Sequence, residues 1–256
     1  MTTTPRRPRI LFGVTGSVAA VKAPEIALKL VKHLDAEVKI ILTKGGDNFW
    51  NKAKDYDPLN WKLLQDEIEN EPAEISTIRV YGEDYEYCQR ILFYPHSIIL
   101  LTDVTCTHDI AAPDEEWKSW NVLGDQVFHI ELRDWADIVL IAPLSAHSLA
   151  KIANGLCDDT LSCVLRAWDL GHGLRPGKPC IVAPAMNTAM YEHPLTLIQL
   201  NIIATFWKDP TQFEIIPPTV KILACGEVGM GALAGSDTIV QAIKQQIKTI
   251  NVNKSN

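Results

Sequence analysis

The stretch "RILFGVTGSVAAVKAPEIALKLVKHL", residues 9–34, decides the fold class of this chain. It begins with an apolar run of strand-forming residues that stops at Gly16, a pattern that predicts a buried strand and a tight turn. After the turn, Ala20, Ile26 and Leu30 recur near one face of a predicted helix. A strand, a turn and a helix in this order indicate the beginning of an α/β fold.

The same alternation returns along the chain. Residues 37–43 predict a second strand, and three more predicted strands lie in "DIVLIAPLS", "KPCIVAPAM" and "FEIIPPT". Helical segments separate the later strands: "AHSLAKIANGL", "DTLSCVLRAW" and "PLTLIQLNIIATF". This order favours a parallel sheet with helices on both faces, whose ligands bind beyond the carboxyl ends of the strands. Four small or polar residues follow predicted strand ends: Gly16, Thr43, Ser145 and Asn187.

The middle of the chain, residues 44–126, does not follow the alternation. It mixes acidic, aromatic and proline-containing segments with two strand-like runs, "TIRVYG" and "SIILLTD". Because this region is too long for a simple connection, we expect a helical segment and an inserted hairpin or pair of strands. We expect one domain over residues 1–256, with 44–126 as a variable insertion and 1–8 and 247–256 as flexible tails.

Composition narrows the class of protein. The chain has 256 residues, of which 47% are hydrophobic, and this suits a single domain with a substantial core. A net charge of −7 disfavours a nucleic-acid partner. The absence of a long apolar run or signal-peptide pattern predicts a soluble cytoplasmic protein that does not bind membranes. The six cysteines form no CxxC pair, so we expect free thiols and no metal site.

The turn "GVTGSVAA" is similar to phosphate-binding turns, in which a helix N-terminus offers backbone N–H groups and a partial positive charge. It is neither GxGxxG nor GxxxxGK[ST], and the missing lysine argues against a nucleoside triphosphatase. The pattern suits the phosphate of a mononucleotide. Taken alone, the same glycine serves equally well for the backbone angles of a tight turn.

Four patterns in order carry a more specific resemblance: "GVTGSVAAVKAPE", "HIELRDWADIVLIAPLSAHSLAKIANGLCDDTLSCVLRAW", "PAMNTAMYEHP" and "LACGEVGMGALA". Together they closely resemble the phosphopantothenoylcysteine decarboxylases, the eukaryotic branch of the homo-oligomeric FMN-containing cysteine decarboxylases. The resemblance covers about residues 9–49 and 128–233. It implies a Rossmann-like, flavodoxin-like fold and an FMN-dependent carboxy-lyase that converts 4'-phosphopantothenoylcysteine to 4'-phosphopantetheine and CO2 in coenzyme A biosynthesis. It also implies a homotrimer with active sites shared between subunits, and a heterotrimer with a paralogue is the other arrangement we consider.

The resemblance also assigns residues to the site. It implies that His129 acts as acid or base, that Asn187 binds the substrate carboxylate, and that Cys225 donates a proton from a glycine-rich loop over the substrate. The residues expected to bind FMN are Gly16, Ser17, Val18, Thr43, Lys44, Phe49, Ser145, Ala146, His147, Ser148, Ala185 and Met186. The residues expected to bind the substrate are Asn187, Met190, Ala224 and Leu233.

Several of these residues also have ordinary structural interpretations. A single histidine such as His129 is commonly a packing or surface residue, and Asn187 suits the N-cap of the helix that follows it. Met186 and Met190 suit a role as gap fillers in the core. His147 departs from the asparagine usual in the family, and we expect an effect on FMN affinity or flavin potential.

Two other functions fit parts of the pattern. Some fungal relatives act as phosphatase-binding regulatory subunits, and other flavoproteins of the family are peptidyl-cysteine decarboxylases. The chain retains His129, Asn187 and Cys225 and ends in "KQQIKTINVNKSN" without an acidic tail. These features favour the enzyme of coenzyme A biosynthesis.

Overall fold

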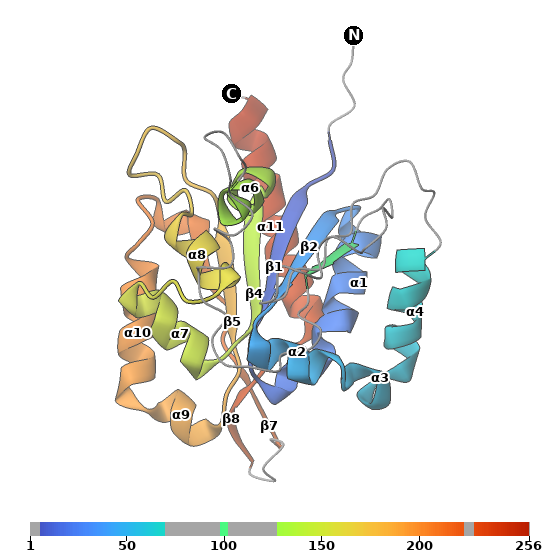
Figure 1. The fold of residues 1–256 in the computed structure, drawn as a ribbon. Helices are drawn as coiled ribbons and strands as arrows, with labels where there is room; N and C mark the ends of the chain where they lie inside the picture. The colour runs from blue at the N-terminus through green and yellow to red at the C-terminus, as the bar shows by residue number, and fades with distance from the viewer. Residues whose placement is uncertain (1–5, 70–97, 102–126, 223–227, 256) are drawn as a thin grey trace.

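The computed structural model describes residues 6–69, 98–101, 127–222 and 228–255. Its main sheet has six strands in the order β3-β2-β1-β4-β5-β6, and every neighbouring pair is parallel. Helices cover both faces of this sheet (Figure 1), so the predicted α/β class is confirmed. The strands are β1 (Arg9–Val14), β2 (Glu37–Leu42), β3 (Ile98–Leu101), β4 (Ile138–Leu144), β5 (Cys180–Pro184) and β6 (Phe213–Ile215).

One face of the sheet packs against helices from both ends of the chain. Buried Ile26 of α1 and Ile239 of α11 belong to the same core cluster as Phe12 of β1. The 3-10 helix η1 precedes α1, which begins where Pro24 suits the first helical turn. The elements between Val18 and Glu69, together with the C-terminal helix, are η1 (Val18–Lys22), α1 (Ala23–Leu34), α2 (Lys44–Trp50), α3 (Ala53–Tyr56), α4 (Pro58–Glu69) and α11 (Ser236–Ser255).

The opposite face packs against helices from the second half of the chain. Leu132 of α6, Leu149 of α7 and Leu161 of α8 are buried in one cluster with Leu11 of β1. The alternation of β1 side chains between two clusters follows from the period of two along a strand. The remaining helices are α6 (Phe128–Trp135), α7 (Ala146–Asn154), α8 (Thr160–Arg166), α9 (Thr188–Glu192), α10 (Pro194–Ala204) and the 3-10 helix η3 (Pro210–Gln212).

The middle of the chain differs in part from expectation. Residues 44–69 are helical as predicted, whereas "SIILLTD" provides β3, which pairs in parallel with β2 and places Ile98 opposite Val38. This run therefore extends the edge of the main sheet, and the expectation of an inserted hairpin or pair of strands stays a prediction. The other strand-like run, "TIRVYG", lies outside the described residues.

Both ends of the chain contribute structure where they are described. Helix α11 continues to Ser255, so residues 247–255 are helical, and Ile239, Ile243 and Ile247 repeat at helical spacing against the core. At the other end, Arg6 makes two hydrogen bonds to the Asp137 carboxylate, at 2.8 and 2.7 Å. The described residues of both predicted tails therefore have defined contacts or secondary structure, and their flexibility stays a prediction.

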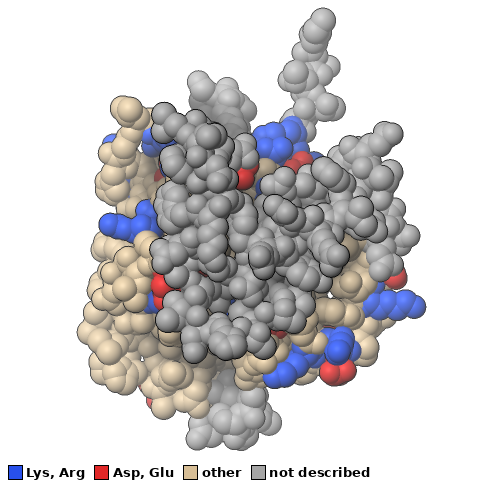
Figure 2. Space-filling view, viewed as in Figure 1, with Lys and Arg blue, Asp and Glu red and all other residues tan. Residues whose placement is uncertain are grey.

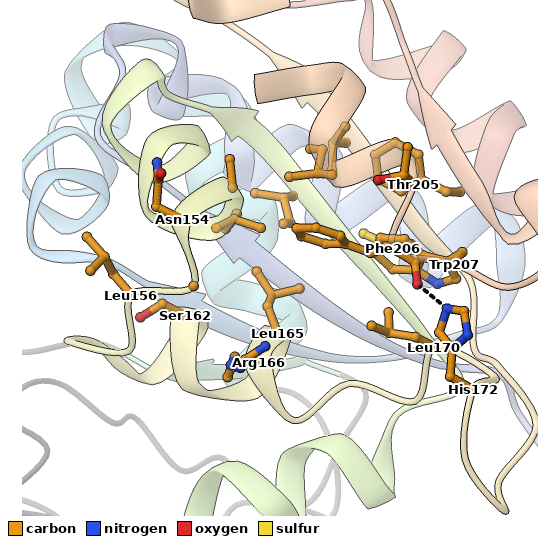
Figure 3. Close-up of a pocket in the computed structure, with 18 residues that line it drawn as sticks. Asn154, Leu156, Ser162, Leu165, Arg166, Leu170, His172, Thr205, Phe206 and Trp207 are labelled. Carbon is orange, nitrogen blue, oxygen red and sulfur yellow. Dashed lines mark hydrogen bonds between the residues drawn. The ribbon is translucent and has the colours of Figure 1, made fainter. Parts of the chain in front are cut away.

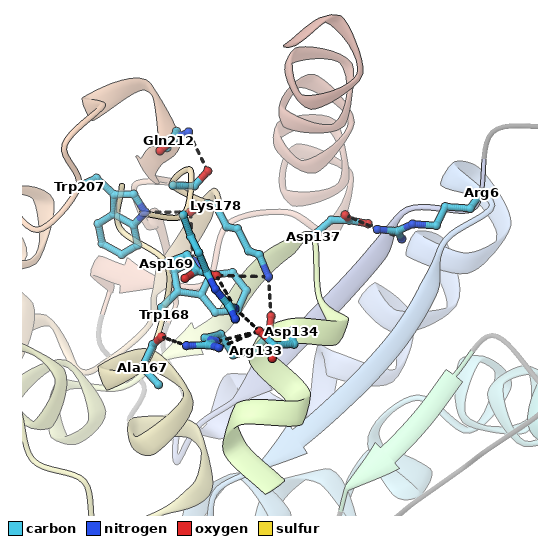
Figure 4. Close-up of polar contacts among 12 residues, drawn as sticks. Arg6, Arg133, Asp134, Asp137, Ala167, Trp168, Asp169, Lys178, Trp207 and Gln212 are labelled. Atoms are coloured by element: carbon cyan, nitrogen blue, oxygen red, sulfur yellow. Dashed lines mark hydrogen bonds and ion pairs between the residues drawn. The ribbon is translucent and has the colours of Figure 1, made fainter. Parts of the chain in front are cut away.

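A polar network ties α6 to the beginning of β5 (Figure 4). Lys178 Nζ donates to the Arg133 carbonyl at 2.6 Å, and burial lowers the pKa of Lys178. The Lys178 carbonyl in turn accepts hydrogen bonds from the indoles of Trp168 and Trp207, at 3.0 and 2.9 Å. Arg175 also pairs with Asp134 of α6. These contacts fix α6 at the end of the sheet where the strands begin.

A two-stranded antiparallel sheet lies at the opposite end. It consists of β7 (Thr219–Ile222) and β8 (Val228–Ala232), and Figure 1 shows this hairpin extending beyond the carboxyl ends of the parallel strands. Its connecting residues, 223–227, lie outside the described residues. Within the part of the chain that the structure describes, no helix is long and apolar enough to cross a membrane.

Candidate active site

The turn after β1 and the start of α2 touch through their backbones. A Cβ atom built on Gly45 would lie 2.7 Å from Gly16 Cα, and one built on Gly46 would lie 2.2 Å from the Val14 carbonyl oxygen. Only glycine fits at either position without backbone movement. The close approach therefore creates a region lined by main-chain atoms at the ends of β1 and β2.

Hydroxyl groups cap the two helices that begin beside these glycines. Ser17 Oγ accepts from Ala19 N at 3.3 Å at the start of η1, and Thr43 Oγ1 accepts from Gly46 N at 3.3 Å at the start of α2. Each cap satisfies one backbone donor of its helix and leaves other first-turn N–H groups directed toward the same end of the sheet.

Thr15 joins this region to the end of β4. Its fully buried hydroxyl donates to the Pro143 carbonyl and accepts from Ser145 N, both at 2.8 Å. Ser145 Oγ then caps α7 by accepting from Ser148 N at 3.2 Å. The predicted residues of the "PLSAHS" segment are thus held beside the β1 turn by Thr15, a residue that the sequence analysis missed. A buried polar residue between a strand and a Gly-Ser turn was the signal that could have found it.

The first turn of α7 has a charged neighbourhood. His147 is exposed, while Lys151 is mostly buried and forms ion pairs with Asp158 at 2.8 Å and Asp159 at 2.9 Å. Burial lowers the pKa of Lys151, but its hydrogen bonds to the two carboxylates outweigh this effect and hold the pKa above its ordinary value. Burial also raises the pKa of Asp158, but its hydrogen bond to Lys151 and, more weakly, the charge of His147 hold it below the ordinary value.

Asn187 follows β5 at the same end of the sheet. Its Oδ1 accepts from Ala189 N at 2.8 Å, so it is the N-cap of α9, as the structural interpretation of this residue predicts. The residue is exposed, while Met186 before it is buried. Capping fixes the acceptor end of the amide, and the opposite end is an N–H donor of the kind that binds carboxylates. A structural role and a binding role are therefore compatible.

The remaining predicted residues have different environments. Lys44, Val18 and Met190 are exposed, Ala146 and Phe49 are half-buried, and Ala185 is buried beside Met186. Leu233 is only 1% exposed and belongs to the main core cluster, and its predicted substrate contact stays a prediction. Ala224 and Cys225 lie outside the described residues.

His129 lies on a different helix from the other predicted residues. It belongs to the first turn of α6, a helix that ends directly before β4 begins. Figure 1 places α6 at the end where the parallel strands begin, and α9 and the β7–β8 hairpin at the end where they finish. Within one chain, the structure therefore brings Gly16, Thr43 and Ser145 together, while α6 and α9 lie apart (Figure 1).

A separate cavity of about 540 Å³ lies between the sheet, α8 and the segments after α7 and α10 (Figure 3). Its wall is mainly apolar, and at one side His172 Nε2 lies 2.9 Å from the Phe206 carbonyl oxygen. None of the residues predicted to bind cofactor or substrate lines it. We therefore place the candidate site at the carboxyl ends of the strands and not in this cavity.

Charge is dispersed on the described part of the surface that Figure 2 shows. Lysine and arginine side chains lie among acidic and uncharged ones, with no large region of a single sign in the described part of that face. In the described residues, no cluster of histidine, cysteine and carboxylate side chains could hold a metal ion. The polar groups described at the carboxyl ends of the strands include backbone atoms beside glycines, hydroxyls and the Asn187 amide.

Comparisons with known proteins identify similar proteins along nearly the whole chain. The model of the family "Flavoprotein" matches residues 2–248. A phosphopantothenoylcysteine decarboxylase of Arabidopsis thaliana is 36% identical over 242 residues, which are 94% of this chain and 86% of that protein. A solved mutant PPC decarboxylase in complex with pantothenoylaminoethenethiol is 34% identical, with a TM-score of 0.63 over 94% of this chain and 98% of that one. The FMN-binding protein AtHal3 is also 34% identical, with a TM-score of 0.61 over 94% of this chain and 96% of that one.

Proposed function

The chain belongs to the Flavoprotein family, and from this premise we propose that it is a phosphopantothenoylcysteine decarboxylase with FMN as its cofactor. It converts 4'-phosphopantothenoylcysteine to 4'-phosphopantetheine and CO2 and acts in the cytoplasm. The observation that carries the proposal is the match along nearly the whole chain to a decarboxylase, combined with an intact set of glycine, hydroxyl and amide groups beyond the strand ends.

The residues beside the β1 turn fit the FMN phosphate and ribityl chain. A Cβ at Gly45 or Gly46 would fill the space where backbone atoms approach one another, and the first turns of η1, α2 and α7 provide N–H donors. Backbone donors at helix N-termini are suited to phosphate groups. We assign Gly16, Ser17 and Ser145 to binding of the FMN phosphate and ribityl chain. Gly45 and Gly46 would allow the close backbone approach that forms this binding region.

The chemistry explains why a flavin is needed. Loss of CO2 from an ordinary sp3 carbon leaves an electron pair that no neighbouring group stabilises. When bound, FMN would supply a reversible two-electron oxidation of the adjacent carbon that bears the substrate thiol, and the oxidised group can stabilise this electron pair. Asn187 donates a hydrogen bond to the carboxylate that leaves, and a neutral donor holds this group less tightly than an arginine ion pair would. His129 moves a proton during the early stages, and Cys225 delivers the last one.

We propose that the active site is made by two subunits, as the resemblance to the family implies. One chain would contribute the FMN region and His129, and its neighbour would contribute Asn187 and Cys225. A closed ring of three identical chains permits this arrangement. Exposed apolar side chains on α9 and α10 suit the covered surface that such an assembly requires: Met190, Leu195, Leu197, Ile198 and Ile202.

Direct assay tests the proposal. The purified protein should be yellow, should release FMN and not FAD on heating, and should form CO2 and 4'-phosphopantetheine from 4'-phosphopantothenoylcysteine. A peptide with a C-terminal cysteine serves as the comparison substrate and should react far more slowly. Colourless protein that does not bind added FMN, or a clear preference for the peptide, would contradict the proposed function.

A further inference from the structure

Strand β8 lies against the residues that flank Asn187. A Cβ built on Gly229 would be 2.2 Å from Thr188 Oγ1, 2.9 Å from its Cγ2 and 3.0 Å from its Cβ. Every staggered rotamer of this threonine leaves at least one branch in one of the two close positions, because threonine is branched at Cβ. A side chain at position 229 would therefore have to displace the backbone at Thr188 or β8 itself.

Gly231 makes the second contact. In the hairpin, Met230 pairs with Val220 and Ala232 pairs with Thr219, so Gly231 is the extra residue of a β-bulge. Its φ angle of 136° favours glycine, and a Cβ there would lie 2.3 Å from the Met186 carbonyl oxygen. The Gly231 carbonyl accepts a hydrogen bond from Met186 N at 3.0 Å. The bulge thus joins β8 to the residue before Asn187.

Thr188 contributes to this contact through its shape. Its hydroxyl oxygen is buried and has no hydrogen-bond partner among the described residues. A buried hydroxyl without a partner lowers stability, so its retention beside Gly229 is not explained by hydrogen bonding. The methyl and hydroxyl groups instead fill the space against the glycine strand.

Resting on the proposed function, we propose that Gly229 and Gly231 are positioning residues for Asn187. Together they contact the two ends of the Met186–Thr188 segment, so that the exposed Asn187 amide occupies one position relative to the substrate carboxylate. The glycines act through packing and one backbone hydrogen bond, and they do not touch the substrate themselves. This role differs from general flexibility of the glycine-rich segment, because each glycine avoids a specific steric conflict that a Cβ atom would create.

A double-mutant experiment in the FMN-loaded protein tests the Gly229 contact. Gly229→Ala should raise KM for 4'-phosphopantothenoylcysteine about tenfold to a hundredfold, as expected when a charge-assisted hydrogen bond is misplaced. FMN content per chain should not change. Thr188→Ala removes both branches that conflict with the new methyl, so Gly229→Ala with Thr188→Ala should recover most of the lost affinity. Gly173→Ala is the matched control, because nothing lies within 4 Å of its added Cβ.

The outcomes separate this inference from the proposed function. A wild-type KM in Gly229→Ala, or a double variant no better than Gly229→Ala alone, would overturn the positioning role. If the wild-type protein binds FMN but does not decarboxylate the substrate, the proposed function fails. In that case urea unfolding tests the contact between Gly229 and Thr188. Non-additive shifts of the urea midpoint for Gly229→Ala and Thr188→Ala support the contact, and additive shifts overturn it.

Discussion

At the scale of single residues, Gly45 shows how the absence of a side chain shapes the candidate cofactor site. Its added Cβ would meet Gly16 Cα at 2.7 Å, a backbone atom that cannot rotate away. We expect Gly45→Ala to separate α2 from the β1 turn and to weaken FMN binding at least about tenfold, equivalent to ~1.4 kcal/mol. Fluorescence titration of the apoprotein with FMN measures the effect, and Gly173→Ala should bind normally. Equal affinities for the two variants would remove Gly45 from the cofactor site.

Cys225 provides a second test at this scale. If it delivers the last proton, Cys225→Ser should still bind FMN and release CO2 but should accumulate a product lighter than 4'-phosphopantetheine by a pair of hydrogen atoms. Mass spectrometry of the product distinguishes the two compounds. Cys157→Ser, which changes a half-buried thiol that donates to the Gly155 carbonyl, should give the normal product. Normal product from Cys225→Ser at the wild-type rate would contradict the assignment.

At the scale of elements, Lys29 connects α1 to the start of α11. Its Nζ lies 3.0 Å from Glu25, 2.7 Å from Asp237 and 2.8 Å from Ser236 Oγ. Burial lowers the pKa of Lys29, but hydrogen bonds to Asp237 and Glu25 outweigh this and raise it above 10.5. The hydrogen bond from Lys29 lowers the pKa of Asp237 below 3.8.

These shifts determine a pH window for the connection. Because the pKa of Lys29 is raised in the folded protein, its contribution to stability is fully present below the unfolded pKa and is lost as pH rises through the folded pKa. Because the pKa of Asp237 is lowered, its contribution is present above the unfolded pKa and is lost as pH falls through the folded pKa. We expect Lys29→Met to lower the urea midpoint slightly between about pH 5 and 9, with a smaller difference outside this range and in high salt. The exposed Lys244→Met is the charge-matched control. A difference from wild type that persists unchanged above about pH 11 would refute the ionic explanation.

At the scale of the whole molecule, assembly is a requirement of the proposed mechanism, because His129 and Cys225 would come from different subunits. His129→Asn and Cys225→Ser proteins should each fail to make normal product. When the two chains are co-expressed, mixed trimers should contain some interfaces with an intact His129 and an intact Cys225, and activity should return in part. A chain that carries both substitutions, expressed as the only chain, should remain inactive.

Two measurements complete this test. Light scattering should report a trimer for the wild-type protein and for each variant, and FMN content should show that each variant folds. A fully active monomer would contradict the shared site, as would mixed trimers that stay inactive although both parent chains bind FMN.

The sequence by itself determined the features that depend on local spacing. Strand and helix periodicity placed β1, β2, β4 and β5 and the residues that follow their carboxyl ends, since neighbouring residues decide which side chains share a face. Tertiary structure alone decided that residues 98–101 extend the main sheet, that Gly45 touches Gly16, and that Gly229 touches Thr188. It also decided that α6 and α9 lie apart (Figure 1). Such relations depend on strand order and on the approach of segments distant in the chain, and no local pattern encodes the distance between them.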